Sequence, residues 1–85
     1  MDKKDFQNML SNSIWMSSEK NTSYQFTNGN FLSINGKDHT PYSINSHSNK
    51  VELLIDSITS YNIEYIDDFT LKLFNKIESF IIMPE

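Results

Sequence analysis

Lys50-Val-Glu-Leu-Leu-Ile-Asp56, Ser60-Tyr-Asn-Ile-Glu-Tyr-Ile66 and Phe69-Thr-Leu-Lys-Leu-Phe74 decide the fold, because apolar and polar residues alternate in each of these three runs. Alternation with a period of two is typical of a β-strand that buries one face. Short polar breaks separate the runs, so the strands can pair in sequence order. The second half of the chain is therefore predicted to be an antiparallel β-meander.

The turns of this meander follow from the requirement that apolar side chains share one face. A five-residue loop over 56–60 keeps the first two runs in phase and sets Glu52 opposite Glu64 and Leu54 opposite Asn62. A two-residue turn after the second run would expose half of the core. We therefore expect a three-residue turn over 66–68 with a local bulge and with Asp68 near the left-handed conformation.

That second turn also fixes which residues face each other across it. A three-residue turn sets Tyr65 opposite Phe69 and Ile63 opposite Leu71, so that the apolar side chains of both strands meet on the buried face.

Two Asn-Gly dipeptides organise the first half of the chain, because both residues of a tight hairpin turn need positive φ. Asn28-Gly29 sets Phe26 opposite Phe31, and Asn35-Gly36 leads into the next strand. Pro41 cannot donate to a strand ladder, so that strand is expected to break or bulge there. The polar run over 45–49 is predicted to be a loop.

The two ends of the chain differ in periodicity. Residues 2–12 have Phe6, Met9 and Leu10 at helical spacing, which predicts a short helix capped by Asp2. Residues 13–19 follow as a first strand with Trp15 as its largest apolar group. The last strand is expected over 77–83, with its inward face left open because alternate residues on both faces are apolar.

These elements define a single all-β domain over residues 1–85, with a short N-terminal α-helix (1–12) and a β-meander (13–83). About eight short antiparallel strands joined in sequence can close into a small barrel, which removes exposed edges. An open half-barrel covered by the helix is the alternative. A closed barrel of this size is filled by its own side chains or holds one small ligand.

Composition excludes several classes of protein. The net charge is −4 and all seven basic residues are lysine, so direct nucleic-acid binding is not expected. The chain has no cysteine, and hence no disulfide, thiolate metal site or cysteine nucleophile. No apolar stretch approaches the roughly 20 residues that span a bilayer, and no signal peptide is visible. A soluble, cytoplasmic protein without membrane contact is expected, apart from a leader already removed.

A tryptophan follows the short helix in Ser13-Ile14-Trp15, and five strand patterns come after it: Tyr24-x-Phe26 with Gly29, Tyr42-x-Ile44, Val51-x-Leu53-x-Ile55, Tyr61-x-Ile63 and Phe69-x-Leu71-x-Leu73. In these features the chain resembles the small bacterial lipocalin-like domains. Ser13 stands where the lipocalin Gly-x-Trp hallmark has glycine. The resemblance implies a calycin-type barrel with an apolar interior.

No residue pattern indicates catalysis, a metal site or a cofactor. His39 and His47 lack metal-ligand spacing and are predicted to be surface residues. No nucleophile-elbow motif accompanies the many serines. Asp67 and Asp68 fit turn chemistry better than a cation site, because aspartate tolerates turn dihedrals and binds nearby backbone amides. We therefore expect a non-enzymatic binding protein.

Two functions remain open. In the first, an acidic outer face binds a protein partner with a basic surface; the predicted contacts are Glu52, Leu54, Glu64, Asp67 and Asp68. The absence of Arg and Ala and the abundance of Asn, Ser, Ile and Lys indicate an AT-rich coding sequence, so such a module resembles interaction or inhibitor proteins of phages and mobile elements. In the second, the barrel carries a small apolar ligand lined by Trp15, Phe26, Phe31, Tyr42, Tyr61, Ile63 and Tyr65.

Overall fold

The computed structural model describes residues 3–27 and 30–85, except for the side chain of Asp38. The predicted helix cap at Asp2 and the predicted turn at Asn28-Gly29 lie outside the described residues. The described part of the chain forms one helix and eight strands: α1 (Lys3–Ser11), β1 (Ile14–Ser17), β2 (Thr22–Phe26), β3 (Phe31–Ile34), β4 (Lys37–His47), β5 (Lys50–Ile55), β6 (Thr59–Asp67), β7 (Thr70–Phe74) and β8 (Ser79–Pro84).

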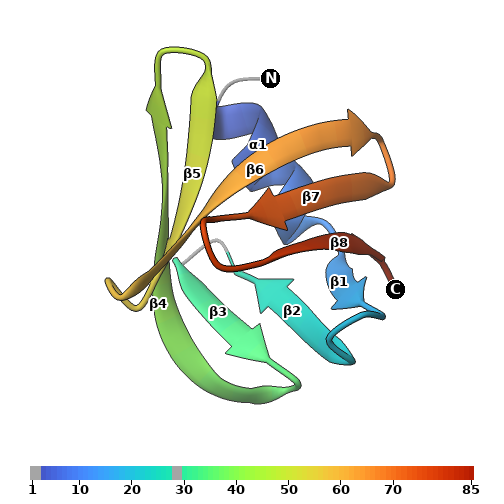
Figure 1. The fold of residues 1–85 in the computed structure, drawn as a ribbon. Helices are drawn as coiled ribbons and strands as arrows, with labels where there is room; N and C mark the ends of the chain where they lie inside the picture. The colour runs from blue at the N-terminus through green and yellow to red at the C-terminus, as the bar shows by residue number, and fades with distance from the viewer. Residues whose placement is uncertain (1–2, 28–29) are drawn as a thin grey trace.

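The strands form a closed antiparallel barrel in sequence order (Figure 1). Closure depends on β1 and β8, where Trp15 lies opposite Pro84 and Met16 opposite Met83. The backbone N–H of Glu85 donates to the carbonyl of Ile14 at 2.7 Å and extends this seam. The predicted all-β meander with an N-terminal helix is confirmed, and the barrel is closed rather than half-open.

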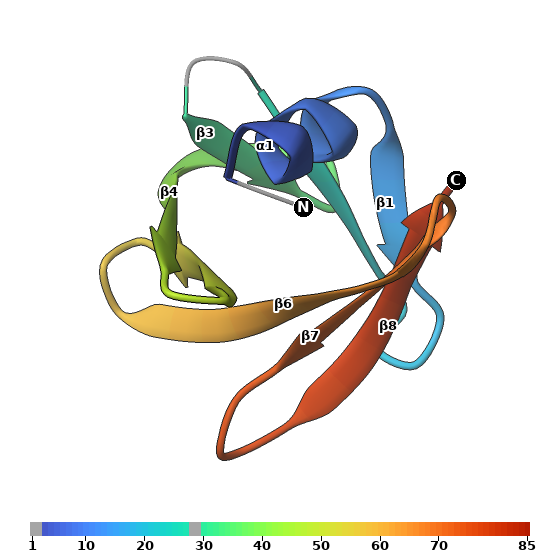
Figure 2. The same cartoon turned by 90° about the horizontal axis from the view of Figure 1, so that it is seen from above.

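Helix α1 packs against β1, β2 and β4 at one end of the barrel (Figure 2). Its predicted apolar face is confirmed, because Phe6 and Leu10 are buried and Met9 packs against the core. The indole N–H of Trp15 donates to the carbonyl of Leu10 at 3.1 Å. This hydrogen bond gives a partner both to a carbonyl in the last turn of the helix and to the N–H of the buried indole. A tryptophan at the start of β1 thus joins the helix to the barrel wall.

Strand β4 is long because it serves both halves of the barrel. It pairs with β3 up to Pro41 and with β5 from Tyr42 onward, and the N–H of Asp56 donates to the Pro41 carbonyl at 2.8 Å. The strand therefore changes partner at the proline instead of breaking there. The predicted loop over 45–49 is wrong: β4 continues to His47, and Ser48 adopts a φ of 54° in a tight turn.

The Asn35-Gly36 turn is confirmed, with φ values of 54° and 73°. A bulge in the β3–β4 pair then places Thr40 opposite Leu32. Leu32 also faces Phe26, so the predicted Phe26–Phe31 pair is wrong. Leu32 faces the core and is fully buried, whereas Phe31 lies on the outer face and is 45% exposed.

The β5–β6 connection is shorter than predicted. It spans 56–58 rather than 56–60, because Asp56 and Ser57 adopt φ values of 54° and 57° and allow a tighter turn. Leu53 consequently faces Tyr61, and Glu52 faces Asn62. The predicted faces survive because a shift of two residues preserves the alternation, but the predicted register is wrong.

The β6–β7 connection contains the predicted bulge, but the bulge lies within β6 and is followed by a two-residue turn. The extra residue is Ile66, between the Tyr65–Leu71 and Asp67–Thr70 pairs. The bulge restores the parity that a two-residue turn alone would lose, so Tyr65 faces Leu71 instead of Phe69, and Ile63 faces Leu73 instead of Leu71. Asp68 does not adopt the expected positive φ, and Phe69 is 69% exposed at the hairpin tip.

The structure also decides the face of the last strand. Phe80 and Ile82 of β8 are buried, whereas Ile81 and Met83 point outward. Phe80 and Ile82 join the inward-facing residues of the other strands in one continuous core.

The adjacent residues Leu53 and Leu54 test this assignment of faces. Leu53→Ala should lower the free energy of unfolding by about 2 to 5 kcal/mol, because the Leu53 side chain is fully buried. Leu54→Ala should lower it by about 1 kcal/mol or less, because Leu54 lies on the outer face and is only partly buried. Urea unfolding followed by tryptophan fluorescence measures both values, and equal losses would contradict this assignment of faces.

Candidate functional site

The acidic surface predicted for partner binding is rearranged by the observed register. Glu52 lies between Asn45 of β4 and Asn62 of β6, and Glu64 faces Lys72 of β7. The predicted facing pair of Glu52 and Glu64 is therefore wrong. A glutamate opposite a lysine is a favourable cross-strand pair, so the local repulsion that pointed to this face is absent.

The remaining members of the predicted surface are divided between this face and the β6–β7 turn. Leu54 is partly exposed on the outer face of β5. Asp67 accepts a hydrogen bond from the backbone N–H of Phe69 at 2.8 Å, and Asp68 accepts one from the Tyr65 hydroxyl. Both aspartates thus bind groups within their own hairpin, in agreement with the predicted turn chemistry.

The seven aromatic and aliphatic residues predicted to line a ligand cavity do not meet in one place. Trp15, Phe26 and Tyr42 are buried at the α1 end, where the Tyr42 hydroxyl donates to the Thr27 carbonyl at 2.8 Å. Tyr61 lies near the opposite end, in a hollow that Lys20 and Phe80 also line.

Ile63 and Tyr65 line a hollow of about 360 Å³ next to Phe6 of α1. Tyr65 is 39% exposed, and Phe31 lies on the outer surface, so neither side chain faces a common interior with Trp15. The predicted lining is therefore distributed over both ends of the barrel and its outside.

The end of the barrel away from α1 contains a hollow of about 310 Å³, here called the barrel mouth. The β3–β4 turn, at the bottom of Figure 1, and the β5–β6 turn, at its lower left, lie at this end. Lys20, Thr22, Thr59 and Tyr61 line the hollow together with an apolar wall formed by Tyr24, Ile34, Leu53, Ile55, Leu73 and Phe80.

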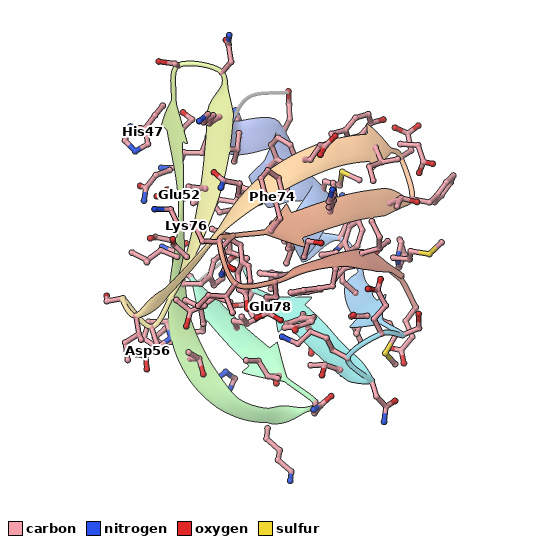
Figure 3. All side chains as sticks on the ribbon, in the orientation of Figure 1. His47, Glu52, Asp56, Phe74, Lys76 and Glu78 are labelled. Carbon is pink, nitrogen blue, oxygen red and sulfur yellow. The ribbon has the colours of Figure 1, made fainter. Side chains whose placement is uncertain are left out.

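A charged pair stands at the edge of the barrel mouth. Lys20, in the β1–β2 turn, places its Nζ 3.0 Å from Oε1 of Glu78, and the same ammonium lies 4.5 Å from the centre of the Phe80 ring. Oε2 of Glu78 accepts a hydrogen bond from the Tyr61 hydroxyl at 2.8 Å. Glu78, labelled in Figure 3, therefore binds one partner with each carboxylate oxygen.

These contacts fix the protonation states at neutral pH. The Tyr61 hydroxyl and the Lys20 ammonium hold the pKa of Glu78 below its usual range. Burial, followed by the hydrogen bond to Glu78, raises the pKa of Tyr61 well above that of a free tyrosine. Burial and then the Glu78 charge raise the pKa of Tyr24 as well. The contacts thus favour a carboxylate at Glu78 and neutral phenols at Tyr61 and Tyr24.

Aromatic rings surround this charged pair. The Phe80 ring is stacked with Tyr24, with centroids 6.3 Å apart, and meets Tyr61 edge to face at 5.4 Å. Both arrangements are favourable for aromatic pairs, so the three rings form a packed wall around the carboxylate.

A third hollow, here called the outer groove, lies between the β5–β6 and β7–β8 turns and has a volume of about 740 Å³. Ile58 and Ile77 line it and are 83% and 91% exposed. Phe74 and Lys76, labelled in Figure 3, complete its β7 side. Asn75 joins the β7–β8 turn to the start of β6 by donating to the Ser60 carbonyl at 3.1 Å, and within its own turn it accepts from the N–H of Ile77 at 2.8 Å.

The sequence alone does not predict the charged pair or the two exposed isoleucines. Lys20 and Glu78 are separated by 58 positions, and only barrel closure brings them together. Ile58 lies between polar residues in the predicted loop over 56–60. Ile77 was expected to begin the last strand, but β8 begins at Ser79 and leaves Ile77 in the turn.

Other chemistry has little support in the described residues. His39 and His47 are exposed, as predicted. No group of three or more histidine, aspartate or glutamate side chains in residues 3–27 and 30–85 could hold a metal ion. Within the same ranges, no helix is long and apolar enough to cross a membrane.

The linkage between Glu78 and pH gives a test of the charged pair. Because its pKa is lower in the folded protein than in the unfolded chain, the pair stabilises the fold above the unfolded pKa of about 4.5, and this contribution is lost as pH falls through the folded value. Glu78→Gln should cost less than about 1 kcal/mol at pH 7, since the side chains are partly exposed, and the cost should shrink at about pH 3.

Urea unfolding of both proteins at the two pH values measures this difference. A cost that grows on acidification would contradict the assigned contacts.

Comparisons with known proteins leave the chain without an established family. No protein-family model matches it, and neither a curated protein nor a solved structure is significantly similar to it. The lipocalin-like resemblance therefore stays a prediction from the sequence.

Proposed function

We propose that this protein is a non-enzymatic binding module that uses its outer surface to contact a protein partner. The observation that carries the proposal is the outer groove, where Ile58 and Ile77 are 83% and 91% exposed. Burying an isoleucine contributes roughly 1.5 to 3 kcal/mol, so two exposed isoleucines lining one groove are a favourable contact for another molecule.

Lys76 is the charged residue that lines the groove, but the chain next to it is acidic, which supports a partner with a basic surface. Five acidic residues and one lysine lie between positions 50 and 68. Among them, Glu52 lies on the outer face of β5, two residues from Leu54, and Asp56 occupies the turn next to Ile58. A partner segment with apolar side chains flanked by lysine or arginine complements this arrangement.

The revised contact surface differs from the one expected from the sequence. Glu52 and Leu54 remain in it, and Ile58, Phe74 and Ile77 are added. Glu64 is paired with Lys72, while Asp67 and Asp68 stabilise the β6–β7 turn, so their part in partner binding is secondary. A small acidic domain with such a face is suited to inhibiting a protein whose basic surface it covers.

Substitution of both isoleucines tests this function. The double variant Ile58→Ser, Ile77→Ser should bind a captured partner at least about tenfold more weakly than the wild type, because the apolar contact is removed from the interface. Phe69→Ser is the matched control, since Phe69 is 69% exposed but lies at the tip of the β6–β7 hairpin, outside the groove.

The measurement is calorimetric titration of the purified partner with each variant. Glu52→Lys should also weaken binding and reduce its dependence on salt concentration. Equal affinity of the wild type and the double isoleucine variant would reject the groove as the contact surface.

A second candidate function is the binding of a small molecule at the barrel mouth. The observation that favours it is the apolar hollow of about 310 Å³, which approaches the size of small-molecule sites and has a few polar groups at its edge. The mouth uses Tyr61 from the originally predicted lining, but its other wall residues come from β2, β3, β5, β7 and β8.

A further inference from the structure

The barrel mouth already holds one cation, which is the side chain of its own Lys20. The ammonium lies 4.5 Å from the centre of the Phe80 ring and 3.0 Å from Glu78, so it has both an aromatic face and a carboxylate as partners. These are the two groups that recognise organic ammonium ions in proteins. The lysine therefore occupies a site with the chemistry of a cation receptor.

Lys20 can leave this site at little cost. Its side chain and that of Glu78 are 33% and 38% exposed, and ion pairs at such positions contribute little to stability. Lysine is carried by the turn between β1 and β2, so its flexible stem can turn into water without a change in the strands. A ligand ammonium would then find the Glu78 carboxylate and the Phe80 ring unoccupied.

We infer that the barrel mouth binds a small organic cation, an amine or quaternary ammonium with an apolar body. Its charged group replaces the Lys20 ammonium between Glu78 and Phe80, and its apolar body enters the hollow against Ile34, Leu53 and Ile55. This inference rests on the second candidate function and names its ligand class.

The charges of the mouth favour a cation over an anion. The Tyr61 hydroxyl donates to Glu78, so its proton is already engaged. An anion would have to draw Lys20 away from Glu78 and would leave two negative groups side by side in a partly apolar site. A cation instead leaves Glu78 paired and releases Lys20 to water, where the ammonium is well hydrated.

Lys20 also acts as a tethered competitor for its own site. A group attached by a short chain has an effective concentration of roughly millimolar, which weakens the binding of any free ligand. Removing the ammonium while keeping the stem, as in Lys20→Met, should therefore increase affinity for a cation. A lysine that only stabilises the fold would not have this effect.

The experiment is a titration of the ¹⁵N-labelled protein with benzyltrimethylammonium, followed by amide chemical shifts. Lys20→Met should bind the probe about fivefold to tenfold more tightly than the wild type, and Glu78→Gln should bind it at least about fivefold more weakly. Lys72→Met is the matched control, because the Lys72 ammonium lies 5.6 Å from the Phe74 ring and lines no part of the mouth. Its affinity should equal that of the wild type.

Two further probes distinguish a cation site from a site for neutral molecules or for anions. Benzyl alcohol, which is neutral, should bind more weakly than the cation; equal affinity would overturn the cation inference and leave a carrier of neutral molecules. Phenylacetate should not bind, and a preference for it would assign the mouth to anions. If no probe shifts the amides around Phe80 in the wild type or in Lys20→Met, both the inference and the second candidate function are rejected, whereas the outer groove is unaffected.

Discussion

The seam between β1 and β8 is the constraint on which the rest of the structure depends. Only two residue pairs, Trp15–Pro84 and Met16–Met83, define the register of this seam in the described chain. Trp15 stabilises it by filling the core and by donating to Leu10 in α1. Closure satisfies the two edges that an open sheet would expose, and it separates an apolar inside from a polar outside.

Closure also determines where binding can take place. Because the inward-facing side chains fill the centre of the barrel, the hollows described above lie at its two ends and between its outer turns. The β1–β2 turn brings Lys20 to the barrel mouth, where Glu78 of the β7–β8 turn and Phe80 of β8 meet it. The outer groove arises in the same way, from two neighbouring hairpin turns that each carry an exposed isoleucine.

The sequence predicts the strands and their faces well, because alternation is a local property: Val51, Leu53, Tyr61 and Ile63 are all buried as expected. Register is harder, since a shift of two residues leaves every face unchanged. The left-handed conformations of Asp56 and Ser57 produce such a shift, and neither residue type requires them. The bulge near Ile66 was predictable because parity demanded an extra residue. The Lys20–Glu78 pair was not, because it exists only after closure.

The most direct test of this account is the nuclear Overhauser effect between the Hα protons of Trp15 and Pro84. Closure predicts a strong cross-peak, because these residues lie opposite each other across the β1–β8 seam and the hydrogen bond from Glu85 to Ile14 makes theirs the non-hydrogen-bonded, closer pair. The pairs between β1 and β2 and between β7 and β8 provide internal references. Reference cross-peaks without the Trp15–Pro84 peak would contradict closure. The protein would then be an open sheet whose free edges offer a different binding mode, the addition of a partner strand.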